Sequence, residues 1–122
     1  MDISQIDFPS MFTDEQMDYI GQSVVDVARR ICGDKLRDVI LYGSYARGDF
    51  HEWSDVDMMV LADIEDTEQW RYEQKFIHEL GELNHHMNLL LSVMVTPYKR
   101  FEYFKRHYPF YTNILREGKK LC

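Results

Sequence analysis

Asp55 and Asp57 stand two residues apart at the start of an apolar run. Because alternate residues of a β-strand point to the same face of a sheet, a strand here would place the two carboxylates side by side. Neighbouring carboxylates repel each other, so such a pair favours a shared cation. Oxygen ligands suit Mg²⁺, which usually binds one or two carboxylates together with the phosphates of a substrate. We therefore predict that Asp55 and Asp57 are metal ligands and catalytic residues.

A second group of candidate residues lies upstream, where another apolar run ends at Gly43 and Ser44. Ten residues separate Ser44 from Asp55. Glycine allows the backbone to come close to a ligand, and the serine adds a hydroxyl group. If a helix starts here, its first amide groups face an anion, as they do in many phosphate sites. A triphosphate site beside a metal site would support phosphoryl chemistry, which depends mainly on positioning and charge neutralisation.

Arg47 is a third candidate for nucleotide binding, because a guanidinium group matches the geometry of phosphate oxygens. It follows the Gly-Ser pair within the same polar stretch. The same side chain could equally form an ion pair with Asp49 or Glu52. The sequence alone leaves both interpretations of Arg47 open.

The elements that must hold these residues can be predicted from apolar periodicity and from helix start and stop signals. The expected order is helix, strand, strand, helix, strand, helix, helix. This order indicates an α/β (α+β) chain with a small mixed sheet of about three to four strands flanked by helices. The length favours one domain over residues 1–122. The expected ranges are 14–32, 39–42, 56–62, 66–85, 88–95, 97–108 and 110–117.

Two of the predicted helices carry specific signals for their position. Thr13 and Gln16 have the spacing of a capping box, which opens the first helix. In the helix over 66–85 we expect four apolar residues to face the core. These are Trp70, Ile77, Leu80 and Leu83.

The composition limits the class of protein and its partners. The chain of 122 residues has a formal net charge of -7. Such a charge repels a phosphate backbone and argues against nucleic acid as a partner. No apolar run approaches the roughly 20 residues that a membrane span needs. The two cysteines, Cys32 and Cys122, form neither a metal-binding pattern nor a disulfide framework, so we expect a reduced, cytoplasmic location.

The Gly-Ser pair, the ten intervening residues and the Asp-x-Asp pair resemble the signature of the polymerase-beta-like nucleotidyltransferase superfamily. The segments GSYARG (43–48) and SDVD (54–57) are similar to its minimal nucleotidyltransferase (MNT) branch. The similarity is continuous over 39–61, and the downstream stretch 110–118 also resembles that branch. The resemblance therefore implies a nucleotidyltransferase fold.

The resemblance also implies a function. Members of the superfamily bind Mg²⁺ with ATP or another nucleoside triphosphate, release pyrophosphate and transfer the nucleoside monophosphate to a hydroxyl group. Many minimal members are antitoxins that pair with a helical HEPN-type ribonuclease toxin and neutralise it by binding and by adenylylation. For this chain the resemblance implies Mg²⁺ as cofactor, ATP as substrate and a HEPN-type toxin as protein partner. The sequence leaves open which group is the acceptor, which nucleobase is used and whether the chain forms a homo-oligomer.

The chain departs from the superfamily at a position that matters for turnover. Active relatives commonly carry a third carboxylate on a later strand, where it helps to hold the metals and acts as general base. The matching strand, 88–95, contains neither Asp nor Glu. Asn88 and Ser92 share one face of this strand, but neither is a base at neutral pH, and Glu82 lies upstream on the preceding helix.

The missing carboxylate leaves several functions open. The chain could be a slow enzyme or an enzyme that its partner completes. It could also be a catalytically silent binding module that neutralises a partner by contact. Nucleotidyl transfer to a small molecule such as an aminoglycoside is a further alternative, because other members of the superfamily resemble enzymes of that kind.

Overall fold

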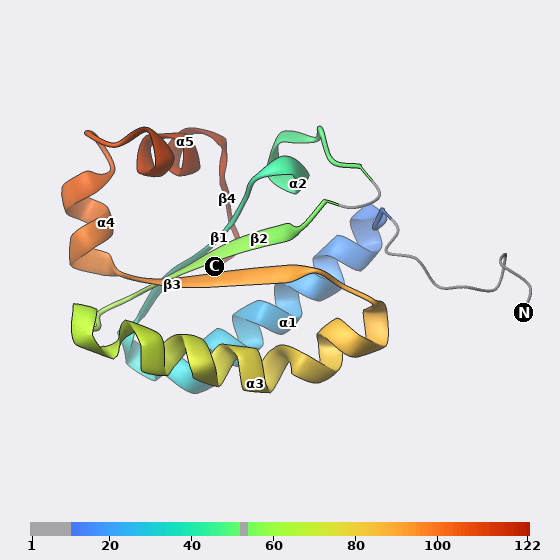
Figure 1. Ribbon diagram of the computed structural model, residues 1–122, viewed down its shortest axis with the longest axis horizontal. Coiled ribbons are helices and arrows are strands. Elements are labelled where there is room, and N and C mark those ends of the chain that lie inside the picture. The colour runs from blue at the N-terminus through green and yellow to red at the C-terminus, as the bar shows by residue number, and fades with distance from the viewer. Residues whose placement is uncertain (1–10, 52–53) are drawn as a thin grey trace, which may run out of the picture.

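A computed structural model describes residues 11–51 and 54–122 of the chain. The described part is one sheet with helices on both faces, as Figure 1 shows, which confirms the predicted α/β class. None of the helices in these ranges has both the length and the apolar character that a bilayer span needs. The elements are α1 (Asp14–Cys32), η2 (Gly33–Lys35), β1 (Leu36–Tyr42), α2 (Ser44–Arg47), β2 (Val56–Ala62), η3 (Asp66–Glu68), α3 (Gln69–Met87), β3 (Leu91–Pro97), α4 (Tyr98–Phe104), α5 (Pro109–Glu117) and β4 (Lys119–Lys120).

The sheet is mixed, as predicted, with strand order β3-β2-β1-β4. β1 runs antiparallel to β2 and to β4, whereas β2 and β3 run parallel. The short strand β4 has no signal in the sequence, because two lysines form no apolar pattern. It pairs with Ile40 and Leu41 of β1, and the following residue, Leu121, donates its amide to the Val39 carbonyl at 2.7 Å. The end of the chain is thereby fixed against the free edge of β1.

Two apolar layers enclose the central strands. α1 and α3 cover one face of the sheet, and α4 and α5 lie on the other (Figure 1). β1 and β2 contribute side chains to both layers, which explains why each is a nearly continuous apolar run. Met58 and Val60 of β2 face the α1/α3 layer, whereas Met59 and Leu61 face the α4/α5 layer. This alternation also decides which face the neighbouring polar side chains use.

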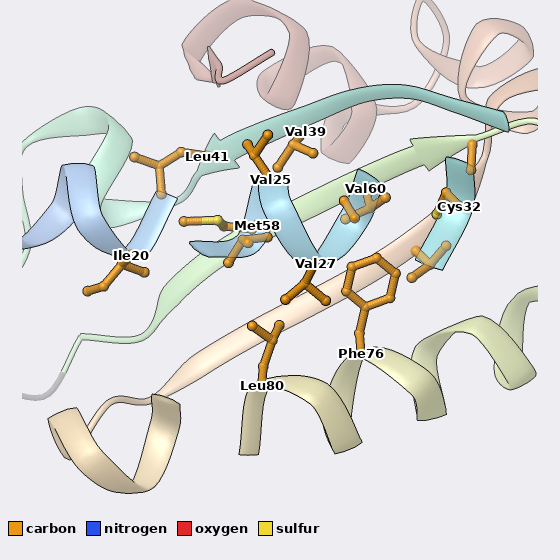
Figure 2. Packing of buried hydrophobic residues seen from close by; sticks show 14 of the residues in the cluster. Ile20, Val25, Val27, Cys32, Val39, Leu41, Met58, Val60, Phe76 and Leu80 are labelled. Atoms are coloured by element: carbon orange, nitrogen blue, oxygen red, sulfur yellow. The ribbon is translucent and has the colours of Figure 1, made fainter. Parts of the chain in front are cut away.

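The α1/α3 layer contains the larger core. α1 begins with the predicted capping box, in which the Gln16 amide donates to Thr13 Oγ1 and the Thr13 amide donates to Gln16 Oε1. Figure 2 shows Phe76 and Leu80 of α3 pointing toward Val27 of α1, and all three side chains are buried. The two long helices therefore pack on each other as well as on the strands.

The inward face of α3 differs from the prediction. Trp70 and Ile77 are 72% and 62% exposed, so the expectation that they face the core is wrong. α3 carries apolar residues on two sides, and exposed apolar side chains are common on folded proteins, so periodicity alone does not select the buried side. The residues that do pack against the core are Tyr72, Phe76, Leu80 and Leu83.

The third strand begins later than expected. β3 starts at Leu91, because Asn88 ends α3 with left-handed backbone angles, φ 51° and ψ 47°. Asparagine tolerates this conformation better than most residues and often follows a helix end. The expectation that Asn88 shares a strand face with Ser92 is therefore wrong, and of these two residues only Ser92 lies in the sheet.

α5 closes the second face of the sheet next to β1. Its first residue is Pro109. Proline suits the first position of a helix because it lacks the N–H group, and the first helical amides have no acceptor within the helix. Ile114 of α5 is buried in one apolar cluster with Ile40 of β1. A Cβ atom at Gly118, which ends the helix, would lie 2.5 Å from both the Ile114 carbonyl oxygen and Ile40 Cγ2. The glycine is thus needed for α5 to lie this close to β1.

Gly118→Ala should lower the free energy of unfolding by about 1–3 kcal/mol, because the added methyl group forces α5 away from β1. Gly81→Ala is the matched control. This glycine lies inside α3, and a Cβ atom there would meet nothing within 4 Å. Alanine at 81 should therefore raise the free energy of unfolding by roughly 0.5–1 kcal/mol. Urea unfolding followed by circular dichroism measures both changes, and equal effects would contradict the close packing of α5.

Candidate active site

Gly43 is the point at which the two predicted groups of site residues meet. It follows the last residue of β1 with φ 76° and ψ -156°, a backbone conformation that is essentially restricted to glycine. A Cβ atom here would overlap the carboxylate of Asp57, with Oδ2 as the nearest atom. Glycine is therefore required twice, by the backbone angles and by the close approach of the carboxylate. The structure places the Gly-Ser turn directly beside the Asp-x-Asp pair.

The turn after Gly43 is the short helix α2. The Gly43 carbonyl accepts from the Arg47 amide at 3.1 Å, which closes the turn. The amides of Ser44 and Tyr45 are the first of the helix, so the helix itself offers them no acceptor. Tyr45 is buried, and its ring stacks on Phe50 with centroids 4.3 Å apart. This stack anchors the turn, so that its amides and the Ser44 hydroxyl are held in place.

Asp57 of β2 lies on the face of the sheet that α4 and α5 cover, the face of Met59 and Leu61. Asp57 is directly opposite Tyr42 in the pairing of β1 with β2, and the exposed Asp55 comes just before β2. Burial raises the pKa of the Asp57 carboxyl, and the negative charge of Asp55 raises it further, whereas the charge of Arg47 lowers it. Burial and the charge of Asp57 raise the pKa of the Tyr42 hydroxyl to about 12. The two carboxylates repel each other in the free protein, and a cation between them would relieve that repulsion.

Arg47 is held by two carboxylates at the edge of the site. Its Nε donates to Asp49 Oδ2 at 3.2 Å, and its Nη1 lies 3.5 Å from Glu117 Oε2. Asp49 is one of the two ion-pair partners that the sequence offers, and the other, Glu52, lies outside the described residues. Neither contact prevents phosphate binding, since the exposed guanidinium group has five N–H donors.

Of the two residues expected near the place of a third carboxylate, only Ser92 lies in the sheet beside Asp57. This residue is the partner of Asp57 in the parallel pair of β2 and β3, so it faces the same side of the sheet. Glu82 is exposed on α3, which covers the opposite face, and so cannot replace it. Within residues 11–51 and 54–122, no three His, Cys, Asp or Glu side chains lie close enough to hold a metal by themselves. Asp55 and Asp57 fit a Mg²⁺ ion whose other ligands are substrate phosphates and water.

A cavity of about 390 Å³ opens beside the turn, between the end of β1 and α5. It brings a carboxylate to the site that sequence reasoning missed, Glu117 at the end of α5. A signal was present, because Phe110, Ile114 and Glu117 recur at the spacing of one helix face. The other lining residues are Tyr42, Gly43, Arg47 and Asn113.

The chain is similar to several known proteins. The family model for the nucleotidyltransferase domain matches residues 25–121. Two proteins of Methanocaldococcus jannaschii are provisionally named protein adenylyltransferases. One is 39% identical over 65 residues, which are 53% of this chain and 64% of the relative, so the chain spans just under two thirds of that protein. The other is 29% identical over 87 residues, 71% of this chain and 79% of the relative.

A solved structure also resembles this fold. It is a crystal structure of a toxin–antitoxin with AMP-PNP, and it matches with a TM-score of 0.50 at 21% sequence identity. The match covers 84% of this chain and 72% of that chain. At this level of identity the likeness concerns the fold alone.

Gly43→Ala should remove the stabilisation of the protein by Mg²⁺ with a nucleoside triphosphate, because the methyl group displaces the Asp57 carboxylate from the turn. Gly48→Ala is the matched control, since Gly48 also has a positive φ, 87°, but a Cβ atom there would meet nothing within 4 Å. Both variants should lose stability through backbone strain of order 1–3 kcal/mol.

Thermal unfolding with and without ligand separates the two effects. Ligand at about 100 times its dissociation constant should add roughly 2.7 kcal/mol to the wild type and to Gly48→Ala. A ligand response that persists in Gly43→Ala would show that the turn and the carboxylate do not act as one site.

Proposed function

Because the chain belongs to the family of nucleotidyltransferase domains, we propose that it is a Mg²⁺-dependent enzyme acting on a protein partner. It binds a nucleoside triphosphate, ATP in particular, and transfers the nucleoside monophosphate to a hydroxyl group of that partner. One observation carries this proposal. The Gly43 backbone lies against the Asp57 carboxylate, which supports one site in which the turn binds phosphate and the carboxylates bind a metal.

In the proposed complex the turn binds the phosphates. The amides of Ser44 and Tyr45 and the Ser44 hydroxyl donate to phosphate oxygens, and Arg47 adds a guanidinium group at the edge. Asp55 and Asp57 hold Mg²⁺, which supplies charge neutralisation for the triphosphate. The repulsion between the two carboxylates in the free protein supports this role, because it makes the site favourable for a cation.

The proposed reaction is a displacement at the α-phosphorus of the triphosphate. The acceptor hydroxyl oxygen forms a bond to this phosphorus, the bond to the oxygen that bridges to the β-phosphate breaks, and pyrophosphate leaves. The hydroxyl must also lose its proton. This chain supports that step least, because Ser92, the residue in register with Asp57, is not a base at neutral pH. We therefore expect slow turnover unless the partner supplies a base.

A protein acceptor agrees with the relatives and with the surface of the chain. The two relatives from Methanocaldococcus jannaschii carry protein adenylyltransferase names, and a toxin–antitoxin structure shares the fold. The surface at α4 and α5 exposes Tyr103 of α4, Tyr108 between the two helices and Leu115 of α5. Aromatic residues are enriched in protein interfaces. With the resemblance to the MNT branch, these features support a cytoplasmic antitoxin that adenylylates a HEPN-type toxin.

A second function is favoured by the side chain at position 92. A serine hydroxyl is not a base at neutral pH, so the site could bind Mg²⁺ and nucleotide without turning it over. The chain would then neutralise its partner by contact alone, with the nucleotide stabilising the bound form.

Transfer can be measured with ATP labelled at the α-phosphate, Mg²⁺ and a HEPN-type partner protein. The wild type should label the partner, and Asp57→Asn should reduce labelling by at least about a hundredfold, since it removes a metal ligand. Ser92→Asp places a carboxylate in register with Asp57 and should raise the rate by roughly a hundredfold. Ser92→Asn has a similar size without a base and serves as the matched control.

The same assay decides between the two functions. The partner could be bound and neutralised although neither the wild type nor Ser92→Asp labels it. In that case the chain is a binding module and not an enzyme. Labelling that continues in Asp57→Asn would mean that the chemistry lies elsewhere.

A further inference from the structure

The cavity between β1 and α5 adjoins the phosphate-binding turn without being part of it. Gly43 lines the cavity and also contacts the Asp57 carboxylate. Arg47 lines it too, and its amide donates to the Gly43 carbonyl in the turn. A ligand whose phosphates lie on the turn can therefore extend into the cavity. The volume of about 390 Å³ is within the usual range for small-molecule sites.

Part of the cavity lining is aromatic. The rings of Tyr42 and Phe110 meet edge to face, with centroids 6.0 Å apart. Phe110 lines the cavity beside the turn, and the residue is 44% exposed. Ile114 adds a buried aliphatic side chain to the same lining. An accessible ring in such a place offers a flat apolar surface of the kind on which nucleobases stack.

Two further lining residues, Glu117 and Asn113 of α5, carry groups that can form hydrogen bonds. Glu117 accepts from Arg47 at 3.5 Å and from Arg116 at 3.4 Å, both long distances for charged partners. A carboxylate has about four lone-pair positions, so it can accept from a ligand as well. Asn113 Oδ1 accepts from Arg116 at 2.9 Å, and its NH₂ group is a donor. An acceptor next to a donor matches the amino group and the ring nitrogen on the edge of adenine.

We propose that this cavity binds the nucleobase of the triphosphate. The base stacks on Phe110, its exocyclic amino group donates to Glu117, and the ring nitrogen N7 accepts from Asn113. This assignment rests on the proposed nucleotide-binding function and deepens it, because it gives α5 the task of base selection. It favours adenine over hypoxanthine, which has the same ring system but carries an oxo group in place of the amino group.

Calorimetric titration in the presence of Mg²⁺ separates the base from the phosphates. The ligands are ATP, ITP (the hypoxanthine nucleotide) and inorganic tripolyphosphate. The wild type should bind ATP at least about tenfold more tightly than the other two. Phe110→Ala should weaken ATP binding by about tenfold and leave tripolyphosphate binding unchanged. Trp70→Ala removes a 72% exposed ring of α3, on the other face of the sheet and outside the cavity, and should change neither affinity.

Glu117→Gln tests the hydrogen bond to the base separately from stacking. The amide can donate to the oxo group of hypoxanthine, so the preference for ATP over ITP should disappear. The ratio of the two affinities is the readout, because any effect of the lost ion pair with Arg47 acts equally on the phosphates of both ligands.

Each outcome has a distinct meaning. Equal binding of all three ligands by the wild type, or equal losses of ATP and tripolyphosphate binding in Phe110→Ala, would overturn the base site and leave the phosphate site intact. An ATP preference that persists in Glu117→Gln would overturn the role of that carboxylate. Failure of the wild type to bind any of the three ligands would overturn the proposed nucleotide-binding function itself.

Discussion

The close approach of the Gly43 backbone to the Asp57 carboxylate joins the two halves of the proposed site, and the pairing of β1 with β2 maintains it. β1 and β2 are antiparallel, so the end of one strand meets the start of the other and Tyr42 lies opposite Asp57. A slip of one residue would turn every side chain of a strand to the other face, and both faces are buried here. The packing that fixes the register therefore also fixes the distance between turn and carboxylate. The favourable free energy of this packing also offsets the repulsion between Asp55 and Asp57 in the free protein.

The two faces of the sheet have different tasks. The α1/α3 layer contains the larger core and stabilises the strands (Figures 1 and 2). The α4/α5 layer contains the smaller buried cluster. The two aspartates, Ser92 and the cavity lie beside this layer. Because Gly118 lets α5 approach β1 closely, the width of the cavity depends on a contact that is itself part of the core. Stability and ligand binding are thus coupled through α5.

Local rules explain what could be predicted from the sequence. The strand that carries Asp57, the Gly-Ser turn and the first helix depend on spacing over a few residues, and the structure places them as expected, whereas Asp55 lies just before the strand. The positions of the later elements depend on contacts between residues that are far apart in the sequence. Glu117 reaches the site only because α5 packs on β1, and it is separated from its partner Arg47 by 70 positions in the sequence. The buried side of α3, the late start of β3 and the two-residue strand β4 likewise follow from packing and pairing, which periodicity does not report.

Paramagnetic broadening by Mn²⁺ in a two-dimensional amide NMR spectrum tests most directly whether the turn and the carboxylates form one metal and triphosphate site. Mn²⁺ accepts the same oxygen ligands as Mg²⁺. With ATP present, broadening should centre on the amides of Gly43, Ser44 and Asp57, and α3 amides such as that of Phe76 should stay sharp. Asp57→Asn should remove the effect. Broadening centred on another acidic surface, or none at all with ATP in excess, would contradict the account.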